Sequence, residues 1–338
     1  MKKAVAIFVG LVAVLITGFL VVREPDVPLD ELKADYANGE SEFVEISPGF
    51  QVHVRDQGPV GAPVLFLVHG FSASLHTWTP WADLLAESYR VVSLDLPGHG
   101  LTGPHPDACY TADCMVAVVD GIADRKGIER FVIGGNSMGG WVSWNYARSY
   151  PEKLAGMILV DASGPIVERE ADGVPIGFRI LNTPVVNQLA KHITPRGMIE
   201  ASLAKTVVDP AFVTEDQVDR YWRLLRRPGN RQAVIDFTQT PRGTPATADL
   251  LSGIDVPTLI IWGAEDSLIP VEAGKVFAAG LPDARLVVFD GVGHIPQEEA
   301  PDRSAAEAAS FLKRVYPPAP GFADGFANSI ATPAMTVP

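Results

Sequence analysis

The sequence predicts an α/β fold in which a mostly parallel central sheet is flanked by helices. Short apolar runs alternate with helical patterns along most of the chain, and this order implies parallel strands joined by right-handed crossovers. Runs such as Val64–Val68 are apolar without interruption, which is typical of strands buried on both faces. A glycine-rich turn around Ser137 also joins one such run to a helical pattern, so a polar side chain is expected above a strand end.

These patterns predict eight strands and five helices, and a Ser-Pro-Gly turn is expected to join the first two strands as a pair. The predicted strands are Phe43–Ile46, Gln51–Arg55, Val64–Val68, Val91–Leu94, Phe131–Ile133, Met157–Val160, Thr258–Trp262 and Leu286–Phe289. The predicted helices are Pro80–Ser88, Ala112–Lys126, Gly140–Ser149, Val271–Ala279 and Pro301–Val315.

The chain divides into a core, an insertion and two tails. The α/β core is predicted over residues 42–163 and 248–316. Residues 164–247 lack a strong strand pattern, and we expect a mainly helical cap over the strand ends, although more of the core domain is an alternative. The acidic, polar residues 24–41 are predicted to be a linker, and the Pro-rich residues 317–338 a disordered tail.

The N-terminal residues 1–23 differ in kind from the rest. Lys2 and Lys3 precede an uncharged apolar run from Ala4 to Val22, about long enough at 1.5 Å per residue to cross a bilayer core of roughly 30 Å. We expect a transmembrane helix with its basic end in the cytoplasm, which anchors the remaining chain outside it (in the periplasm of a Gram-negative bacterium). A cleaved signal peptide, which gives a secreted protein, is the alternative.

Composition restricts the class of partner. The chain has 338 residues, of which 47% are hydrophobic and 20% are charged, so it can bury a sizeable core. Its formal net charge of −13 would repel a nucleic-acid backbone, and nucleic acid is therefore not an expected partner. The oligomeric state stays open.

The two cysteines, Cys109 and Cys114, lie close together in the sequence. An oxidising compartment would permit a disulfide between them, provided that their Cα atoms approach within about 7 Å. Whether they pair stays open at this point. No second Cys or His pair lies at ligand spacing, so no metal site is predicted.

Ser137 is the predicted nucleophile. It lies in Gly135-Asn136-Ser137-Met138-Gly139, between the end of a predicted strand and the start of a predicted helix. A nucleophile at such a turn must stand above the sheet, and glycines two residues before and after it let the backbones approach without a Cβ clash. The pattern alone is weak, but its place between strand and helix makes it specific.

Two further strand ends supply the predicted acid and base. Asp266 follows the strand at Thr258–Trp262, and His294 lies between glycine-containing turns after the last strand. A carboxylate that holds an imidazole in one tautomer lets it take the serine proton. Glu265 and Asp161 are the rival acids.

Two backbone amides are expected to form an oxyanion hole for the charge that develops during acyl transfer. Phe71 follows the strand that ends in Val68-His69, and Met138 directly follows the nucleophile. We expect His69 to brace this loop rather than to act as the base. His76 and Trp78, in the same loop, are expected to line the substrate pocket.

In combination these motifs resemble the α/β-hydrolase superfamily, in its serine-nucleophile, esterase- and lipase-like branch. The resemblance spans about Phe43 to Val315 and implies the α/β-hydrolase fold and a Ser-His-Asp triad, but not the substrate. The matching motifs, in chain order, are His69-Gly70, Asp95-Leu96-Pro97-Gly98-His99-Gly100, the Ser137 turn, Trp262-Gly263-x-x-Asp266 and Gly293-His294.

The resemblance predicts a carboxylic ester hydrolase that forms an acyl-enzyme and needs no metal or organic cofactor. Dehalogenases and epoxide hydrolases of this fold carry Asp at the nucleophile position, whereas this chain has Ser137. Carbon–carbon bond hydrolases of ring-cleavage products are an alternative, weakened because they typically carry Trp where Ile295 stands, and a lactonase is another. A non-enzymatic binding module is disfavoured by the intact triad.

Overall fold

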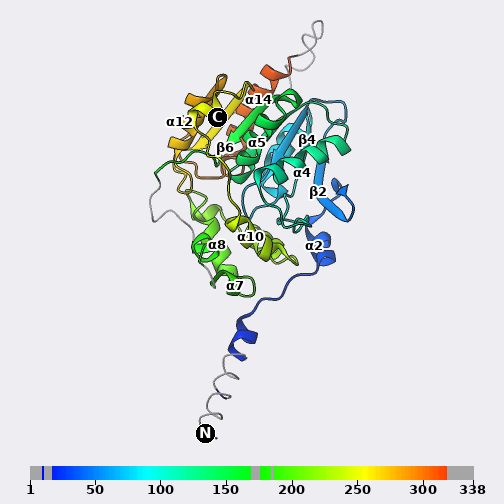
Figure 1. Cartoon of the computed structure of the whole chain (residues 1–338), viewed down its shortest axis with the longest axis vertical. Coiled ribbons are helices and arrows are strands. Elements are labelled where there is room, and N and C mark those ends of the chain that lie inside the picture. Colours follow the sequence, from blue (N-terminus) through cyan, green and yellow to red (C-terminus); the bar gives the residue numbers. More distant parts are fainter. Residues whose placement is uncertain (1–9, 11–16, 169–175, 184–185, 318–338) are drawn as a thin grey trace, which may run out of the picture.

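A computed structural model describes residues 10, 17–168, 176–183 and 186–317 of the chain (Figure 1). Its centre is an eight-stranded sheet in the order β1-β2-β4-β3-β5-β6-β7-β8. From β4 onward all neighbouring pairs are parallel, whereas β2 pairs antiparallel with both β1 and β4. The predicted mostly parallel sheet is therefore confirmed.

The strands agree with the apolar runs of the sequence and extend beyond several of them by one to three residues. β3 to β7 are buried along their whole length, as their uninterrupted apolar sequences require. The bounds are β1 Ser41–Ser47, β2 Phe50–Gln57, β3 Val64–Val68, β4 Arg90–Leu94, β5 Phe131–Asn136, β6 Leu154–Val160, β7 Thr258–Gly263 and β8 Ala284–Phe289.

Helices cover both faces of the sheet, and each face has its own apolar cluster. On one face, Met115, Trp141 and Phe277 bring α4 (Ala112–Arg125), α5 (Met138–Ser149) and α12 (Val271–Gly280) into one core. On the other face, Trp81 and Phe311 bring two further helices into a second core. These two helices are α3 (Thr79–Leu85) and α14 (Pro301–Val315).

Parallel pairing brings the carboxyl ends of β3, β5, β6, β7 and β8 to one edge of the sheet. The loops that follow these strands carry the predicted oxyanion loop, nucleophile, acid and histidine. Residues far apart in the chain therefore meet at this edge, where ligands bind in open α/β sheets.

Between β6 and β7 the described residues form helices and no strand, and these helices lie beyond the sheet in Figure 1. We use "the cap" for residues 164–247. Its helices are α6 (Ile176–Leu181), α7 (Val186–Ala190), α8 (Arg196–Leu203), the 3₁₀ turn Pro210–Phe212, α9 (Glu215–Leu225) and α10 (Asn230–Gln239), and α11 (Ala248–Leu251) leads into β7.

The segment predicted as a linker is instead packed onto the cap. Residues 24–36, called the strap below, include helix α2 (Leu29–Tyr36), in which Leu32 is fully buried beside Leu224 of α9. Arg223 binds Glu31 and Asp35 of the strap at 2.7 and 2.6 Å. The linker prediction was wrong because Arg223, which pairs with these acidic side chains, lies far away in the sequence. The acidic composition alone therefore indicated solvent exposure.

The rest of the strap is fixed by hydrogen bonds to the cap backbone and to Arg231. Glu24 N–H donates to the His192 carbonyl at 2.9 Å, and Val27 N–H donates to the Arg226 carbonyl at 2.9 Å. Arg231 of α10 binds Asp26 at 2.6 Å. The strap thus binds the cap through these residues, and its C-terminal end also contacts the sheet, where Arg55 of β2 donates to the Tyr36 carbonyl at 3.0 Å.

Most of the predicted N-terminal anchor and all but residue 317 of the predicted C-terminal tail lie outside the described residues; of the anchor, residues 10 and 17–23 are described. Within the ranges given above, no helix is both long and apolar enough to cross a bilayer. The described residues 17–22 lie beyond the cap on the side away from the sheet (Figure 1). Cys109 and Cys114 form a disulfide, with their Cα atoms 6.0 Å apart, which answers the question that the sequence left open.

Candidate active site

The turn between β5 and α5 holds Ser137 in a backbone conformation that few residues adopt. Its φ of 54° and ψ of −112° lie outside the ordinary regions, so the surrounding structure must stabilise them. A Cβ at Gly135 would lie 2.2 Å from the Gly139 carbonyl, and one at Gly139 would lie 2.0 Å from the Val68 carbonyl. The predicted glycine pattern therefore reflects real backbone contacts.

Hydrogen bonds fix this turn against β6 and against the histidine loop. Ser137 N–H donates to the Val160 carbonyl at 2.9 Å, and Ser163 N–H donates to the Ser137 carbonyl at 2.9 Å. The Asn136 amide donates to the carbonyls of His294 at 3.0 Å and of Val160 at 3.2 Å. Asn136, which the sequence did not single out, thus connects the nucleophile turn to the backbone of the base.

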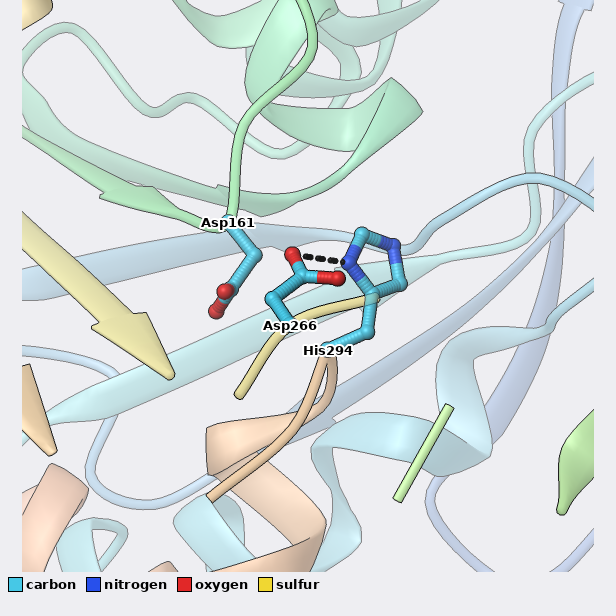
Figure 2. A group of neighbouring side chains, drawn as sticks. All are labelled: Asp161, Asp266 and His294. Carbon is cyan, nitrogen blue, oxygen red and sulfur yellow. Dashed lines mark hydrogen bonds and ion pairs between the residues drawn. The ribbon is translucent and has the colours of Figure 1, made fainter. Parts of the chain in front are cut away.

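The predicted acid and base are in contact. His294 Nδ1 lies 2.7 Å from Asp266 Oδ2, and both side chains are buried (Figure 2). The other oxygen, Asp266 Oδ1, accepts from the N–H groups of Leu268 at 2.8 Å and Ile269 at 3.1 Å. These donors favour the ionised form of Asp266, which then holds a proton on Nδ1 and leaves Nε2 of His294 as the basic nitrogen.

The two rival acids have other roles. Glu265 Oε2 accepts from the N–H groups of Gly291 and Val292 at 2.9 and 3.1 Å, so it fixes the histidine loop instead of the imidazole. Asp161 lies on the far side of Asp266 from His294 in Figure 2. Burial, and next the negative charge of Asp266, raise the pKa of Asp161 well above its usual range.

The loop after β3 lies directly against the nucleophile. A Cβ at Gly70 would be 3.3 Å from the Ser137 Cβ, so the backbone here passes close to the serine. His69 braces the loop: its Nδ1 donates to the Gly70 carbonyl at 2.7 Å, and its Nε2 accepts from Leu96 N–H at 3.0 Å. Phe71 follows in this loop, and Met138 begins α5, where the first N–H groups have no intrahelical acceptor. Their role as oxyanion donors stays a prediction.

A cavity of about 160 Å³ contains the predicted nucleophile, base and Phe71 in its lining. The remaining lining comes mostly from apolar side chains of the cap, which the sequence could not identify because they come from several short helices. Six of them are Leu181, Met198, Leu203, Leu225, Val234 and Ile235.

His76 and Trp78 do not line this cavity, and their assignment to the pocket was wrong. Both are buried in the 3₁₀ turn Leu75–Trp78. His76 Nδ1 accepts from the Ser74 hydroxyl at 2.9 Å, while its Nε2 lies 2.9 Å from Arg55 and 3.0 Å from the Tyr36 carbonyl. His76 and Trp78 follow Phe71 closely in the sequence, but the chain leaves the cavity lining after Ala73.

A segment of the cap is hydrogen-bonded to the catalytic loops at three places. His294 N–H donates to the Thr206 carbonyl at 2.7 Å. The Ser267 hydroxyl donates to the Lys205 carbonyl at 2.9 Å, and Val208 N–H donates to Glu299 at 2.7 Å. The cap therefore helps to position the base.

Asp95 organises the scaffold beneath the oxyanion loop. Its carboxylate accepts from Leu75 N–H at 2.8 Å, Leu101 N–H at 2.7 Å and His53 Nδ1 at 2.7 Å. Despite complete burial, the nearby His53 lowers the pKa of Asp95 far below its usual range. The turn that begins at Asp95, one of the motifs matched in the sequence, thus holds one buried negative charge.

One group of described side chains has the spacing of metal ligands, and it is the trio Asp161, Asp266 and His294. Within this trio, Nδ1 of His294 is already bound to Asp266. The donor set therefore fits proton transfer, and it gives no reason to assign a metal.

The family profile described as the alpha/beta hydrolase fold matches residues 63–301. The chain is an α/β-hydrolase. It is 30% identical over 285 residues to a 2-hydroxy-6-oxononadienedioate/2-hydroxy-6-oxononatrienedioate hydrolase of Paraburkholderia phymatum, covering 80% of this chain and 95% of that protein. It is 28% identical over 265 residues to an uncharacterised hydrolase of Bacillus subtilis, covering 78% of this chain and 95% of the relative.

Among solved structures, this α/β-hydrolase is similar to a membrane phospholipase A described as a bacterial virulence factor. The TM-score is 0.68 at 25% identity, and the match covers 93% of this chain and 99% of the phospholipase. A meta-cleavage product hydrolase of Pseudomonas fluorescens, with TM-score 0.71 and 23% identity over 82% of this chain and 100% of that one, shows the same fold.

Replacing the nucleophile should abolish the reaction with phosphonylating probes of serine hydrolases. Ser137→Ala is expected to remove labelling by a fluorophosphonate probe and to lower kcat by at least about 10⁴-fold, because no other group can form the acyl-enzyme. Ser163→Ala is the matched control, since Ser163 binds the Ser137 turn through its backbone N–H, and it should label normally. Labelling of the folded Ser137→Ala protein would contradict the assignment.

Stability should fall in mild acid. Burial lowers the pKa of His76 and of His99 to about 3, and it also lowers the pKa of His69. Between about pH 6.5 and 3 the unfolded chain binds protons on these imidazoles that the folded chain does not, so the free energy of unfolding decreases as pH falls. Each imidazole adds up to about 1.4 kcal/mol per pH unit.

Urea unfolding midpoints measured from pH 7 to pH 4 test this expectation. His99→Asn keeps a donor for the Pro97 carbonyl, which His99 Nδ1 contacts at 3.0 Å, and it should reduce the pH dependence by one proton. A wild-type midpoint that stays constant from pH 7 to pH 5 would count against buried neutral histidines.

Proposed function

We propose that this α/β-hydrolase cleaves carboxylic esters of apolar acyl chains through an acyl-enzyme on Ser137. The observation that carries the proposal is the mostly apolar cavity that contains both Ser137 and His294 in its lining. Similarity to a membrane phospholipase A supports it, because that structural match covers 93% of this chain, whereas the structural match to the meta-cleavage product hydrolase covers 82%.

In this mechanism Nε2 of His294 takes the Ser137 proton as Oγ forms a bond to the acyl carbon. The Phe71 and Met138 amides stabilise the oxyanion, each contributing about 10²- to 10³-fold in kcat. The carbon–oxygen bond to the alcohol breaks, and His294 protonates the departing oxygen. His294 then deprotonates a water that attacks the acyl group, and its proton returns to Ser137 as the acid leaves.

The cavity carries two positive charges with different partners. Its lining includes two cationic side chains, Lys191 and Arg231. Arg231 is bound to Asp26 at 2.6 Å, and Lys191 lies 3.0 Å from Gln188 and 3.3 Å from Gln232. A substrate carboxylate would have to compete with Asp26 for Arg231, whereas the partners of Lys191 are neutral amides. The preference for an alkyl chain therefore depends on the apolar side chains of the lining and not on these cations.

A carbon–carbon bond hydrolase is the second candidate. Curated hydrolases of this name from Pseudomonas and Paraburkholderia are 29% and 30% identical to the chain. Their named substrates are dioates, which carry two carboxylates, and a polar or cationic lining would suit both. Arg231 is already paired with Asp26, whereas Lys191 contacts neutral amides, so the mostly apolar lining is the observation that favours the ester.

Ester chain length should control the rate. With nitrophenyl esters, kcat/KM is expected to rise about three- to fourfold per added methylene until the cavity is filled, because each buried methylene contributes about 0.8 kcal/mol. Leu203→Trp, which narrows the cavity, should move the optimum to shorter acids. Val208→Trp is the control, since Val208 is 46% exposed and is not among the residues that line the cavity.

The same assay distinguishes the two candidates. Loss of the dienoate absorbance of a ring-cleavage product, at a kcat/KM above that for every ester tested, would favour carbon–carbon cleavage. A preference for acetate or for charged acids would also contradict the apolar acyl site.

We also propose that the apolar N-terminal run keeps the enzyme at a membrane, with its catalytic domain outside the cytoplasm. Deletion of residues 1–23 should release a soluble enzyme with wild-type kcat, because the strap remains. Deletion of residues 1–37 should in addition lower the Tm by several degrees, because it removes the buried Val27 and Leu32. Fractionation and thermal melts measure both effects, and a full-length protein that is wholly soluble with its N-terminus intact would refute the anchor.

A further inference from the structure

Asp161 is a buried carboxyl group for which the acyl-transfer mechanism has no use. It directly follows β6, is 0% exposed, and adopts a φ of 44°, which is uncommon for any residue except glycine. Its N–H donates to the Ile261 carbonyl of β7 at 3.0 Å, which helps to hold this conformation. An uncommon backbone conformation beside reactive groups is a reason to look for a role there.

The side chain of Asp161 faces the acid of the triad. One oxygen of Asp161, one oxygen of Asp266 and one ring nitrogen of His294 all lie within 4.8 Å of one another. Figure 2 shows the three side chains in a row, with Asp266 in the middle. Asp161 Oδ1 accepts from Gly263 N–H at 3.0 Å, whereas no N–H or O–H donor in the described part of the chain reaches Oδ2.

Two neighbouring carboxyl groups without solvent cannot both carry a negative charge. Asp266 accepts from two backbone N–H groups and from His294, while Asp161 accepts from one N–H group. Hydrogen bonds to an anion stabilise it, so the charge belongs on Asp266 and the proton on Asp161. Glu299, the other acidic group that acts on Asp161, adds a further negative charge and favours the same arrangement.

We propose that Asp161 is a positioning residue of the triad, an uncharged carboxylic acid whose Oδ2–H donates a hydrogen bond to the Asp266 carboxylate. The pair then presents a single negative charge to His294. Asp266 is held from both sides, by His294 and by Asp161, in the orientation that keeps Nε2 of the imidazole directed away from it. The proposal applies to cleavage of an ester and of a carbon–carbon bond alike.

Substitutions of Asp161 test whether this side chain acts as a neutral hydrogen-bond donor or as a charged carboxylate. Asp161→Asn keeps a donor toward Asp266 and an acceptor for Gly263 N–H, and Asn tolerates a positive φ. We expect it to retain kcat within about threefold, with the acid limb of the pH profile of kcat/KM unmoved. Asp161→Gly keeps the backbone conformation but removes the donor, and kcat should fall about tenfold while KM is unchanged.

Asp95 offers a matched control, because it is an equally buried aspartate in which both oxygens accept hydrogen bonds. Asp95→Asn would turn an amide N–H₂ group toward N–H donors, so it should lower the Tm, whereas Asp161→Asn should not. If an ester is not the substrate, the rate of fluorophosphonate labelling of Ser137 replaces kcat as the readout.

A measurement on the unmodified enzyme covers the case in which a variant fails to fold. Infrared spectra at pH 7 should show the carbonyl band of a protonated carboxyl group, which persists in Glu298→Gln, a variant that lacks another carboxyl whose pKa is raised by burial. Absence of this band overturns the proposal. So does a downward shift of the acid limb in Asp161→Asn by more than about half a pH unit, because loss of a true anion would lower the basicity of His294. Wild-type kcat in Asp161→Gly overturns it as well.

Discussion

The hydrogen bond of 2.7 Å between His294 and Asp266 is the interaction on which the site depends. In a buried setting an imidazole gains a proton only if a fixed negative charge lies beside it, and a fixed negative charge is stable only if donors surround it. Two backbone N–H groups of the loop after β7 supply such donors. The rest of the fold can be understood as the means of bringing the loops after β5, β7 and β8 to one edge of a sheet.

Much of this arrangement could be predicted because it is local in the sequence. Continuous apolar runs identify buried strands, and β3 is predicted to the residue. Glycines at positions 135 and 139 mark a turn too tight for any Cβ, which is why the pattern around Ser137 is informative. Strand order along the chain then implied that Asp266 and His294 lie at the same edge, and their contact confirms it.

What could not be predicted depends on pairs distant in the sequence. The acidic strap looked like a linker because Arg223 and Arg231, which neutralise it, follow about 190 to 200 residues later. His76 looked like a pocket residue until Arg55 and the Tyr36 carbonyl were found beside it. Asp161 looked like a rival acid, and only the geometry shows it behind Asp266 rather than beside the imidazole.

The three hydrogen bonds between residues 205–208 and the catalytic loops restrict how such an enzyme can be altered. A cap is often treated as an exchangeable module that sets specificity on an invariant core. Here the Thr206 carbonyl holds the backbone of His294, so a chimera with a foreign insertion would lose catalytic power along with the old selectivity unless it kept a carbonyl at that point. Exchange of cap segments before or after residues 205–208, with these four residues retained, is therefore expected to yield active hybrids more often than exchange of the entire insertion.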